Sequence, residues 1–334
     1  MHRREFLHHG VMATGIGAAV TGCHTALRRM RKPAHQVPAA EGSRAIDAAA
    51  FHAMRRFADT RFGRIAYIER GAGAAALFIH GFPLNGFQWR GALERLSAHR
   101  RCIAPDLLGL GYTEVANGQS LAPAAQADML VALLDALAVD AADVTANDSG
   151  VAIAQLLAVR YPSRVRSLLL TNGDVHTNSP PAALGPVLAQ ARDGVLADQF
   201  LAPQLADPAF ARSPQGLGGL AYTDPASLTD ESIGCYFAPL LSSPRRKTLF
   251  HGYAVAFEPN PLVDLESALR RCSVPARMVW GTGDPLFPAH WADWLARTLP
   301  AARGVRRVRG ANLFFPEEQP DLIAEEAQRL WSAG

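Results

Sequence analysis

Short apolar runs alternate with longer segments of helical spacing from about residue 55 to the end of the chain, and only a few folds accept this order. The apolar runs read as buried strands at 64–68, 75–79, 101–104, 143–146, 165–170, 276–280 and 305–308. The longer segments read as helices at 87–98, 123–137, 151–161, 290–299 and 321–331. Helices that connect successive parallel strands produce this order, so the sequence predicts an α/β fold with a mainly parallel central sheet flanked by helices.

One long segment, residues 176–265, breaks the alternation. It begins dense in Pro, Ala and Gly, which predicts little helix at first, and then carries several short apolar segments. The simplest description is a sheet domain formed by 51–175 and 266–334, with 176–265 inserted into it.

Composition excludes several classes of protein. The chain has 33 basic and 30 acidic side chains and is 49% apolar, as in an ordinary soluble globular protein. After residue 32 the acidic side chains slightly outnumber the basic ones, so we expect no nucleic-acid partner. Cys102, Cys235 and Cys272 are too scattered for a disulfide framework. No metal-ligand spacing and no phosphate-binding glycine loop occurs, so we predict no cofactor and no metal.

The first 50 residues have the pattern of a targeting segment and a tether. Arg3 and Arg4 precede a weakly apolar run at 10–22, which is too short to span a bilayer, and residues 1–23 resemble a twin-arginine export signal. A basic tail is the alternative. Residues 20–23 resemble a lipobox in which Cys23 would be lipidated, with simple cleavage near Ala19 as the rival. Residues 24–50 read as a tether, and we expect an exported protein, periplasmic or held to the membrane only by a lipid on Cys23.

The segment 143–155 runs from a strand through a tight turn directly into a helix. Such an elbow exposes its central side chain above the sheet and needs small residues two places before and after it. Centred on Asp148, these places hold Ala146 and Gly150, whereas Ser149 as the centre would have larger flanking residues. We therefore favour Asp148 as nucleophile over Ser149. The competing interpretation is that Asp148 caps the following helix.

A carboxylate at such an elbow attacks an sp3 carbon and forms an alkyl ester, which water must then cleave. The substrates implied are alkyl halides or epoxides. The turn at residues 80–83, His-Gly-Phe-Pro, follows a predicted strand, and there the backbone amide of Phe82, together with that of Ser149, would form a two-donor oxyanion hole.

These motifs together resemble the α/β-hydrolase fold family, in its capped branch of haloalkane dehalogenases and epoxide hydrolases. Four segments carry the resemblance in the family's order: 80–83, 105–113, 146–150 and 280–288. The resemblance implies that Asp284 is the acid that orients a catalytic histidine, and that residues 176–265 form a helical cap. A turn-forming role for Asp284 is the alternative.

The catalytic histidine is missing from its expected place. The family's histidine segment corresponds to 310–320, where Leu313 occupies the histidine position. A leucine cannot accept a proton from water. His176, with Asp174 as an orienting acid, is the first candidate for a substitute base, while His290, His80 and His251 read more simply as structural or surface residues.

We expect a pocket for a small hydrophobic molecule, with His80, Trp89, Tyr222 and Tyr236 as substrate-binding residues. Cap tyrosines would protonate an epoxide, and Tyr222, Tyr236 and Tyr253 are available for this. The Trp that commonly follows the nucleophile in halide-binding enzymes is replaced by Ser149. Two other interpretations remain open: a binding protein that has lost catalysis, and a serine esterase that uses Ser149. The sequence leaves the oligomeric state open.

Overall fold

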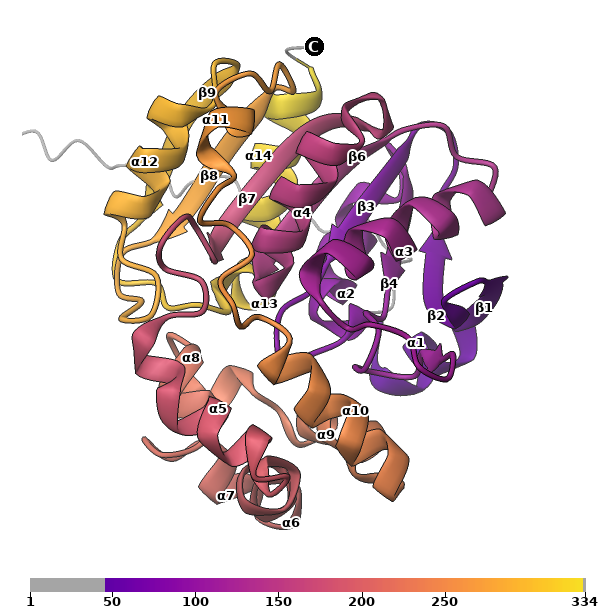
Figure 1. The fold of residues 1–334 in the computed structure, drawn as a ribbon, viewed down its shortest axis with the longest axis vertical. Coiled ribbons are helices and arrows are strands. Elements are labelled where there is room, and N and C mark those ends of the chain that lie inside the picture. The colour runs from indigo at the N-terminus through magenta and orange to yellow at the C-terminus, as the bar shows by residue number, and fades with distance from the viewer. Residues whose placement is uncertain (1–45, 333–334) are drawn as a thin grey trace, which may run out of the picture. The chain divides into compact units, whose positions relative to one another are not determined.

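The computed structural model describes residues 46–332, so the predicted export signal, the lipobox at Cys23 and most of the tether lie outside the described residues. The described chain forms one sheet of nine strands with helices on both faces (Figure 1). The strands are β1 (Arg56–Thr60), β2 (Gly63–Arg70), β3 (Ala75–Ile79), β4 (Arg101–Pro105), β5 (Glu114–Val115), β6 (Ala142–Asp148), β7 (Val165–Gly173), β8 (Ala276–Gly281) and β9 (Ala302–Val308).

The strand order is β1-β2-β4-β3-β6-β7-β8-β9, with β5 beside β2. From β4 to β9 the neighbouring strands are parallel, whereas the pairs β1–β2, β2–β4 and β2–β5 are antiparallel. The predicted α/β fold with a mainly parallel sheet is therefore confirmed. Strands β3 and β6 are buried at every residue, as expected for central strands covered on both faces.

The sheet domain contains helices between its strands, one helix before β1 and two after β9. They are α1 (Ala48–Met54), α2 (Arg90–Leu96), α3 (Pro123–Ala136), α4 (Ser149–Arg160), α11 (Glu266–Leu269), α12 (His290–Thr298), α13 (Phe315–Glu318) and α14 (Pro320–Trp331). Helices α3 and α4 lie in front of the sheet in Figure 1, and α14 lies behind it. Helix α4 is buried along nearly its whole length and ends at Arg160, with Tyr161 as its C-cap before a proline that cannot continue it.

The segment 176–265 carries the remaining helices at the carboxyl ends of the parallel strands, at the bottom of Figure 1. They are α5 (Gly185–Arg192), α6 (Ala202–Ala206), α7 (Pro208–Ala211), α8 (Leu217–Ala221), α9 (Asp230–Leu241) and α10 (Pro244–Val255). The prediction that this segment begins helix-poor is wrong. Three of its prolines stand at the first or second helical position of α5, α6 and α7, where the missing N–H costs no hydrogen bond.

Within residues 46–332, we find no helix that combines the length and the apolar character needed to cross a bilayer.

Candidate functional site

The elbow between β6 and α4 has the geometry of a strained turn. Asp148 is the last residue of β6 and has φ +55°, a left-handed conformation that side chains other than glycine rarely adopt. A Cβ at Gly150 would lie 2.7 Å from the carbonyl oxygen of His80, so only glycine fits there. In the described part of the chain the Asp148 side chain makes no capping hydrogen bond to α4, and it faces the turn at residues 80–83 instead.

The turn after β3 approaches the Asp148 carboxylate closely. The backbone amide of Phe82 donates a hydrogen bond of 2.7 Å to Oδ2 of Asp148. A Cβ at Gly81 would lie 2.5 Å from Asp148 Cβ, so the glycine permits this approach. Burial raises the pKa of Asp148 to about 7, while the amides of Phe82 and Ser149 lower it and the charge of Asp284 raises it. The carboxylate thus lies against two backbone donors in a site that disfavours its charge.

Two buried polar side chains hold the turn in position. Nε2 of His80 accepts a hydrogen bond of 3.0 Å from the amide of Leu107, and burial lowers the pKa of this histidine. Gln88 accepts from the amide of Gly81 at 3.1 Å and donates to Oδ1 of Asn147 at 2.6 Å. Since Asn147 precedes Asp148, Gln88 ties the turn to the elbow.

A pocket of about 130 Å³ lies over Asp148. This volume is below the roughly 300 Å³ of sites for drug-sized ligands, so the pocket suits a small molecule. Its polar side chains are those of Asp148, Ser149, Asp174 and Tyr253, and its remaining lining is aliphatic and aromatic, with Phe82 beside the elbow. The arrangement is that of a small apolar chamber with two carboxyl groups in its wall.

Tyr253 of α10 is the one of the three candidate cap tyrosines that lines the pocket. Its hydroxyl and that of Ser149 are hydrogen-bonded at 2.9 Å. Its ring stacks on Phe82 with an interplanar angle of 2° and a centroid distance of 5.8 Å. Burial raises the pKa of Tyr253 above its ordinary value, so its hydroxyl keeps its proton.

Asp174 lies in the pocket wall immediately after β7. Its backbone amide donates to the carbonyl oxygen of Asp148 at 3.4 Å, so the backbones of the two aspartates are in contact. Burial raises the pKa of Asp174 well above its ordinary value, the charge of Asp148 raises it further, and the nearby Ser179 hydroxyl lowers it only in part. Among the described residues, Oδ1 of Asp174 has no hydrogen-bond partner of good geometry.

Asp284 follows β8 and is buried, but its oxygens are engaged by other groups. Oδ2 accepts a hydrogen bond of 2.8 Å from the side-chain amide of Asn172. Oδ1 accepts from the amides of Leu286 and Phe287 at 2.8 and 3.3 Å. Burial raises the pKa of this carboxyl, and these hydrogen bonds lower it. The described contacts of Asp284 are those of a turn-forming aspartate, because they include no imidazole.

Comparison with known proteins places this site in a family. The family model described as "alpha/beta hydrolase fold" matches residues 76–319, which is most of the chain. The chain belongs to the α/β-hydrolase fold family. A 2-hydroxymuconate semialdehyde hydrolase of Pseudomonas sp. (strain CF600) is 30% identical over 243 residues, which cover 69% of this chain and 78% of that protein.

Other relatives of this α/β-hydrolase carry different names. The haloalkane dehalogenase 2 of Mycobacterium tuberculosis is 33% identical over 117 residues, covering 35% of this chain and 41% of that protein. Among solved structures, an α/β-hydrolase fold protein from Burkholderia ambifaria has a TM-score of 0.70 at 23% identity, covering 83% of this chain and 97% of that one. The epoxide hydrolase CorEH has a TM-score of 0.66 at 20% identity, covering 84% and 98%. Likeness at these identities shows the fold alone.

Histidines of the α/β-hydrolase do not reach the pocket: none in residues 46–332 lines it. His176 lies with Nε2 3.4 Å from a carboxylate oxygen of Glu266, and its ring packs on Trp294 with a centroid distance of 4.7 Å. His251 accepts a hydrogen bond of 3.0 Å from the amide of Ala197. The structure therefore separates His176 from Asp174, which does line the pocket.

Leu313 lines the pocket from the loop before α13 and is 4% exposed. Its carbonyl oxygen accepts a hydrogen bond of 3.0 Å from the side-chain amide of Asn147, the residue before the elbow. The neighbouring Asn312 donates its side-chain amide to the carbonyl oxygen of Tyr222 at 2.9 Å. This loop thus presents an aliphatic side chain beside Asp148.

The four predicted substrate-binding side chains are not among those that line the pocket, so this prediction needs correction. His80 supports the turn beneath it, and Trp89 is buried against Phe78. Tyr222 and Tyr236 instead belong to a polar cluster between the segment 176–265 and the sheet domain.

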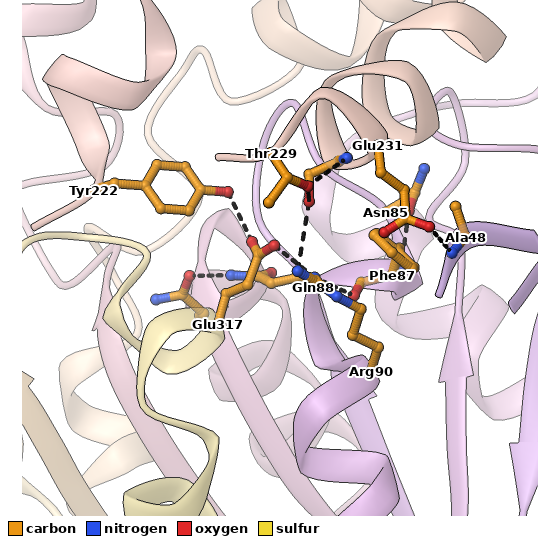
Figure 2. A network of polar contacts seen from close by, with 11 residues as sticks. Ala48, Asn85, Phe87, Gln88, Arg90, Tyr222, Thr229, Glu231 and Glu317 are labelled. Atoms are coloured by element: carbon orange, nitrogen blue, oxygen red, sulfur yellow. Dashed lines mark hydrogen bonds and ion pairs between the residues drawn. The ribbon is translucent and has the colours of Figure 1, made fainter. Parts of the chain in front are cut away.

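Figure 2 shows this cluster, in which the hydroxyl of Tyr222 donates to a carboxylate oxygen of Glu317 at 2.7 Å. Arg90 donates to the other oxygen of Glu317 at 2.5 Å, and it lies 3.4 Å from the hydroxyl of Ser232. Tyr236 packs edge-on against Phe87 nearby. The buried Glu317 carboxylate binds the Tyr222 hydroxyl outside the pocket lining, and the sequence alone does not reveal this pairing.

Within residues 46–332, no group of three or more His, Cys, Asp or Glu side chains is arranged to hold a metal ion.

Proposed function

We propose that this α/β-hydrolase is an exported enzyme that attacks a small hydrophobic haloalkane or epoxide with Asp148. The observation that carries the proposal is the placement of the Asp148 carboxylate, which stands at a strained elbow, faces an apolar pocket and accepts a hydrogen bond from the Phe82 amide. The local similarity to haloalkane dehalogenase 2 of Mycobacterium tuberculosis supports this substrate class.

The elbow and the turn at residues 80–83 supply groups for ester formation and for the oxyanion that follows. The carboxylate of Asp148 attacks an sp3 carbon, forms an ester and displaces a halide or opens an epoxide ring. Water then adds to the ester carbonyl carbon, and the amides of Phe82 and Ser149 stabilise the resulting oxyanion. Asp284 is proposed as a supporting acid. The apolar walls exclude competing polar substrates.

Mass spectrometry tests the nucleophile directly. Incubation of the full chain with 1-bromobutane or styrene oxide should add the alkyl group to the peptide that contains Asp148, and turnover in H₂¹⁸O should place ¹⁸O in its carboxyl group. The Asp148→Asn variant should show neither change. Absence of both adduct and product from the wild-type protein with these two reagents would contradict the proposal.

A second candidate function is a small-molecule binding protein on the same fold. It is favoured by one observation: the described lining holds Leu313 and no histidine. This candidate predicts that styrene oxide raises the melting temperature equally in the wild type and Asp148→Asn, with no diol formed. A serine esterase is less well supported because the Ser149 hydroxyl lies against Tyr253. Covalent inhibition by an organophosphate at Ser149 would revive it.

Export is a separate part of the proposal and rests on the arginine pair at residues 3 and 4 and on the apolar run that follows. Replacement of both arginines by lysine should leave the protein in the cytoplasm of the host cell. Loss of radiolabelled palmitate from a Cys23→Ala variant, with export retained, would identify Cys23 as the lipid anchor.

A further inference from the structure

The pocket contains a carboxyl group that the proposed nucleophile does not use. Asp174 is 3% exposed, lines the pocket together with Asp148, and among the described residues its Oδ1 has no hydrogen-bond partner of good geometry, although the Ser179 hydroxyl is nearby. Unpaired buried oxygens are costly, and they are retained where a ligand or a reaction supplies the partner.

The elbow itself holds the two aspartates together. The amide of Asp174 donates to the carbonyl oxygen of Asp148, and the intervening Gly173 would clash with that oxygen if it had a Cβ, at 2.3 Å. On its other side Asp174 is fixed through its own carbonyl oxygen, which accepts a hydrogen bond of 2.8 Å from Gln155 of α4. Asp174 is therefore attached to the same strand end and the same helix as the nucleophile.

Burial and the Asp148 charge together make Asp174 keep its proton while Asp148 carries no ester. Burial raises the pKa of Asp174, and the Asp148 charge raises it further. Tyr253 is the other titratable side chain in the described lining, and the charge of Asp284, outside that lining, raises the pKa of Asp148. Once Asp148 is converted to a neutral ester its charge is gone, so the pKa of Asp174 falls and its carboxylate forms more readily.

We propose that Asp174 is the acid and then the base of this site, in place of a histidine, and that the substrate class is therefore epoxides. The inference rests on the proposed role of Asp148. It also names a substrate: a halide leaves without a proton, whereas the oxygen of an opening epoxide needs one.

In the first step the Asp148 carboxylate attacks one epoxide carbon and the ring C–O bond breaks. The epoxide oxygen takes the proton of Asp174, so the products are a neutral hydroxyalkyl ester on Asp148 and a carboxylate on Asp174. The negative charge has moved from one aspartate to the other.

In the second step the Asp174 carboxylate takes a proton from water while the water oxygen bonds to the ester carbonyl carbon. The oxyanion, stabilised by the amides of Phe82 and Ser149, collapses and the bond to the alcohol oxygen breaks. The alcohol oxygen takes the proton that Asp174 received from water. The proton left on the Asp148 carboxyl passes to Asp174. Epoxide and water are consumed, one diol is formed, and both aspartates return to their starting states.

The test compares two reagents on the full chain with Asp174→Asn, which keeps the shape of the side chain and removes its transferable proton. With styrene oxide, diol formation should fall by about 100-fold or more relative to the wild type, since this is the range of general acid–base effects. With 1-bromobutane, which needs no acid, the Asp148 peptide of this variant should still gain a butyl group, and the ester should persist. That adduct also shows that the variant folds.

Two further variants separate Asp174 from its neighbours. Tyr253→Phe removes the other proton donor of the pocket and should retain at least about a tenth of the diol formation, which is above the range for loss of an acid–base group. Asp174→Ala should be inactive with styrene oxide and should recover activity on addition of sodium formate, which supplies a carboxyl group to the vacated space. A purely structural role for Asp174 would not give this rescue.

Wild-type rates of diol formation in Asp174→Asn, or loss of activity in Tyr253→Phe alone, would overturn the inference while leaving Asp148 as nucleophile. Rapid hydrolysis of the butyl ester by Asp174→Asn would overturn it as well. If the wild-type protein forms no adduct with either reagent, the role of Asp148 fails first, and the inference fails with it.

Discussion

The backbone amide of Phe82 and Oδ2 of Asp148 are hydrogen-bonded at 2.7 Å across the gap between the end of β3 and the start of α4. This contact favours the charged carboxylate, but burial outweighs it and raises the pKa of Asp148 to about 7. The site thus gives up stability so that a carboxylate can face an apolar chamber, which is a common compromise at active sites.

The pH dependence of stability follows from this raised pKa. In the unfolded chain Asp148 ionises near pH 4, whereas the folded protein holds the proton up to about pH 7. Its contribution to stability is therefore complete below pH 4 and is lost as the pH rises through 7. At pH 8 Asp148→Asn should raise the free energy of unfolding by up to about 4 kcal/mol, measured by urea denaturation.

Asp59→Asn is the matched control, because the Asp59 side chain is 89% exposed on β1. It should change stability by less than about 0.5 kcal/mol at any pH. The difference in free energy of unfolding between the wild type and Asp148→Asn should therefore change with pH. If this difference is constant from pH 4 to 8, burial does not raise the pKa of Asp148.

The rate of ester formation should follow the same ionisation in the opposite sense. Only the Asp148 carboxylate attacks carbon, so the rate of butyl transfer from 1-bromobutane should rise with pH, about tenfold per unit below pH 7, and then level off. Stopped incubations analysed by intact mass measure this directly. A rate that is flat between pH 5 and 8 would contradict the assigned ionisation.

Gly81→Ala tests whether the close approach of the turn matters. The added Cβ would lie 2.5 Å from Cβ and 2.6 Å from Oδ2 of Asp148, which forces the turn and the elbow apart. We expect loss of butyl transfer by about 100-fold, since a nucleophile displaced by about 1 Å from its line of attack can lose this much rate. Gly185→Ala at the start of α5, where a Cβ meets nothing within 4 Å, should leave the rate unchanged. Equal rates of butyl transfer in the two variants would show that the close approach of Gly81 to Asp148 does not affect the reaction.

The cluster in Figure 2 should stabilise the attachment of the segment 176–265 to the sheet domain. The Glu317 side chain is 2% exposed and pairs with both Arg90 and Tyr222. Glu317→Gln leaves the guanidinium without its buried counter-charge and should cost about 3 kcal/mol in thermal or urea unfolding. Asp321→Asn, which breaks an ion pair in which the carboxylate is 84% exposed, should cost less than about 1 kcal/mol. Similar losses in the free energy of unfolding for the two variants would contradict a stabilising role of the Glu317 cluster.

The sequence predicted the sheet and the elbow because both depend on local pattern. Strand β3 is one apolar run, and the elbow needs the small residue Gly150 at a fixed offset from Asp148, which the structure explains by contact with the carbonyl oxygen of His80. The pocket lining depends on contacts between distant segments. Tyr222 and Tyr253 look alike in sequence, yet one is bound by Glu317 and the other reaches Ser149.

The predicted pairing of Asp174 with His176 is wrong for a related reason. In sequence it stands two residues before His176, which suggests an acid–histidine pair, but His176 has φ +49° and turns toward Glu266 and Trp294. The positive φ of His176 turns its side chain away from Asp174. The residue type histidine does not predict this backbone conformation. The proximity of Asp174 to the elbow follows from the parallel pairing of β6 with β7, in which Asp148 lies opposite Gly173.

Leu313→His gives the last test, because it supplies an imidazole at a position that already lines the pocket with Asp148. In the Asp174→Asn background, the butyl ester formed from 1-bromobutane should persist for lack of a base. Adding Leu313→His should hydrolyse this ester and release butanol, by about 100-fold over the single variant, since an imidazole accepts a proton from water near neutral pH. Leu313→Gln, of similar polarity but without a titratable group, should leave the ester intact. If the glutamine variant cleaves the ester as fast as the histidine variant, easier entry of water rather than a base explains the hydrolysis. A base at position 313 then does not act on the ester.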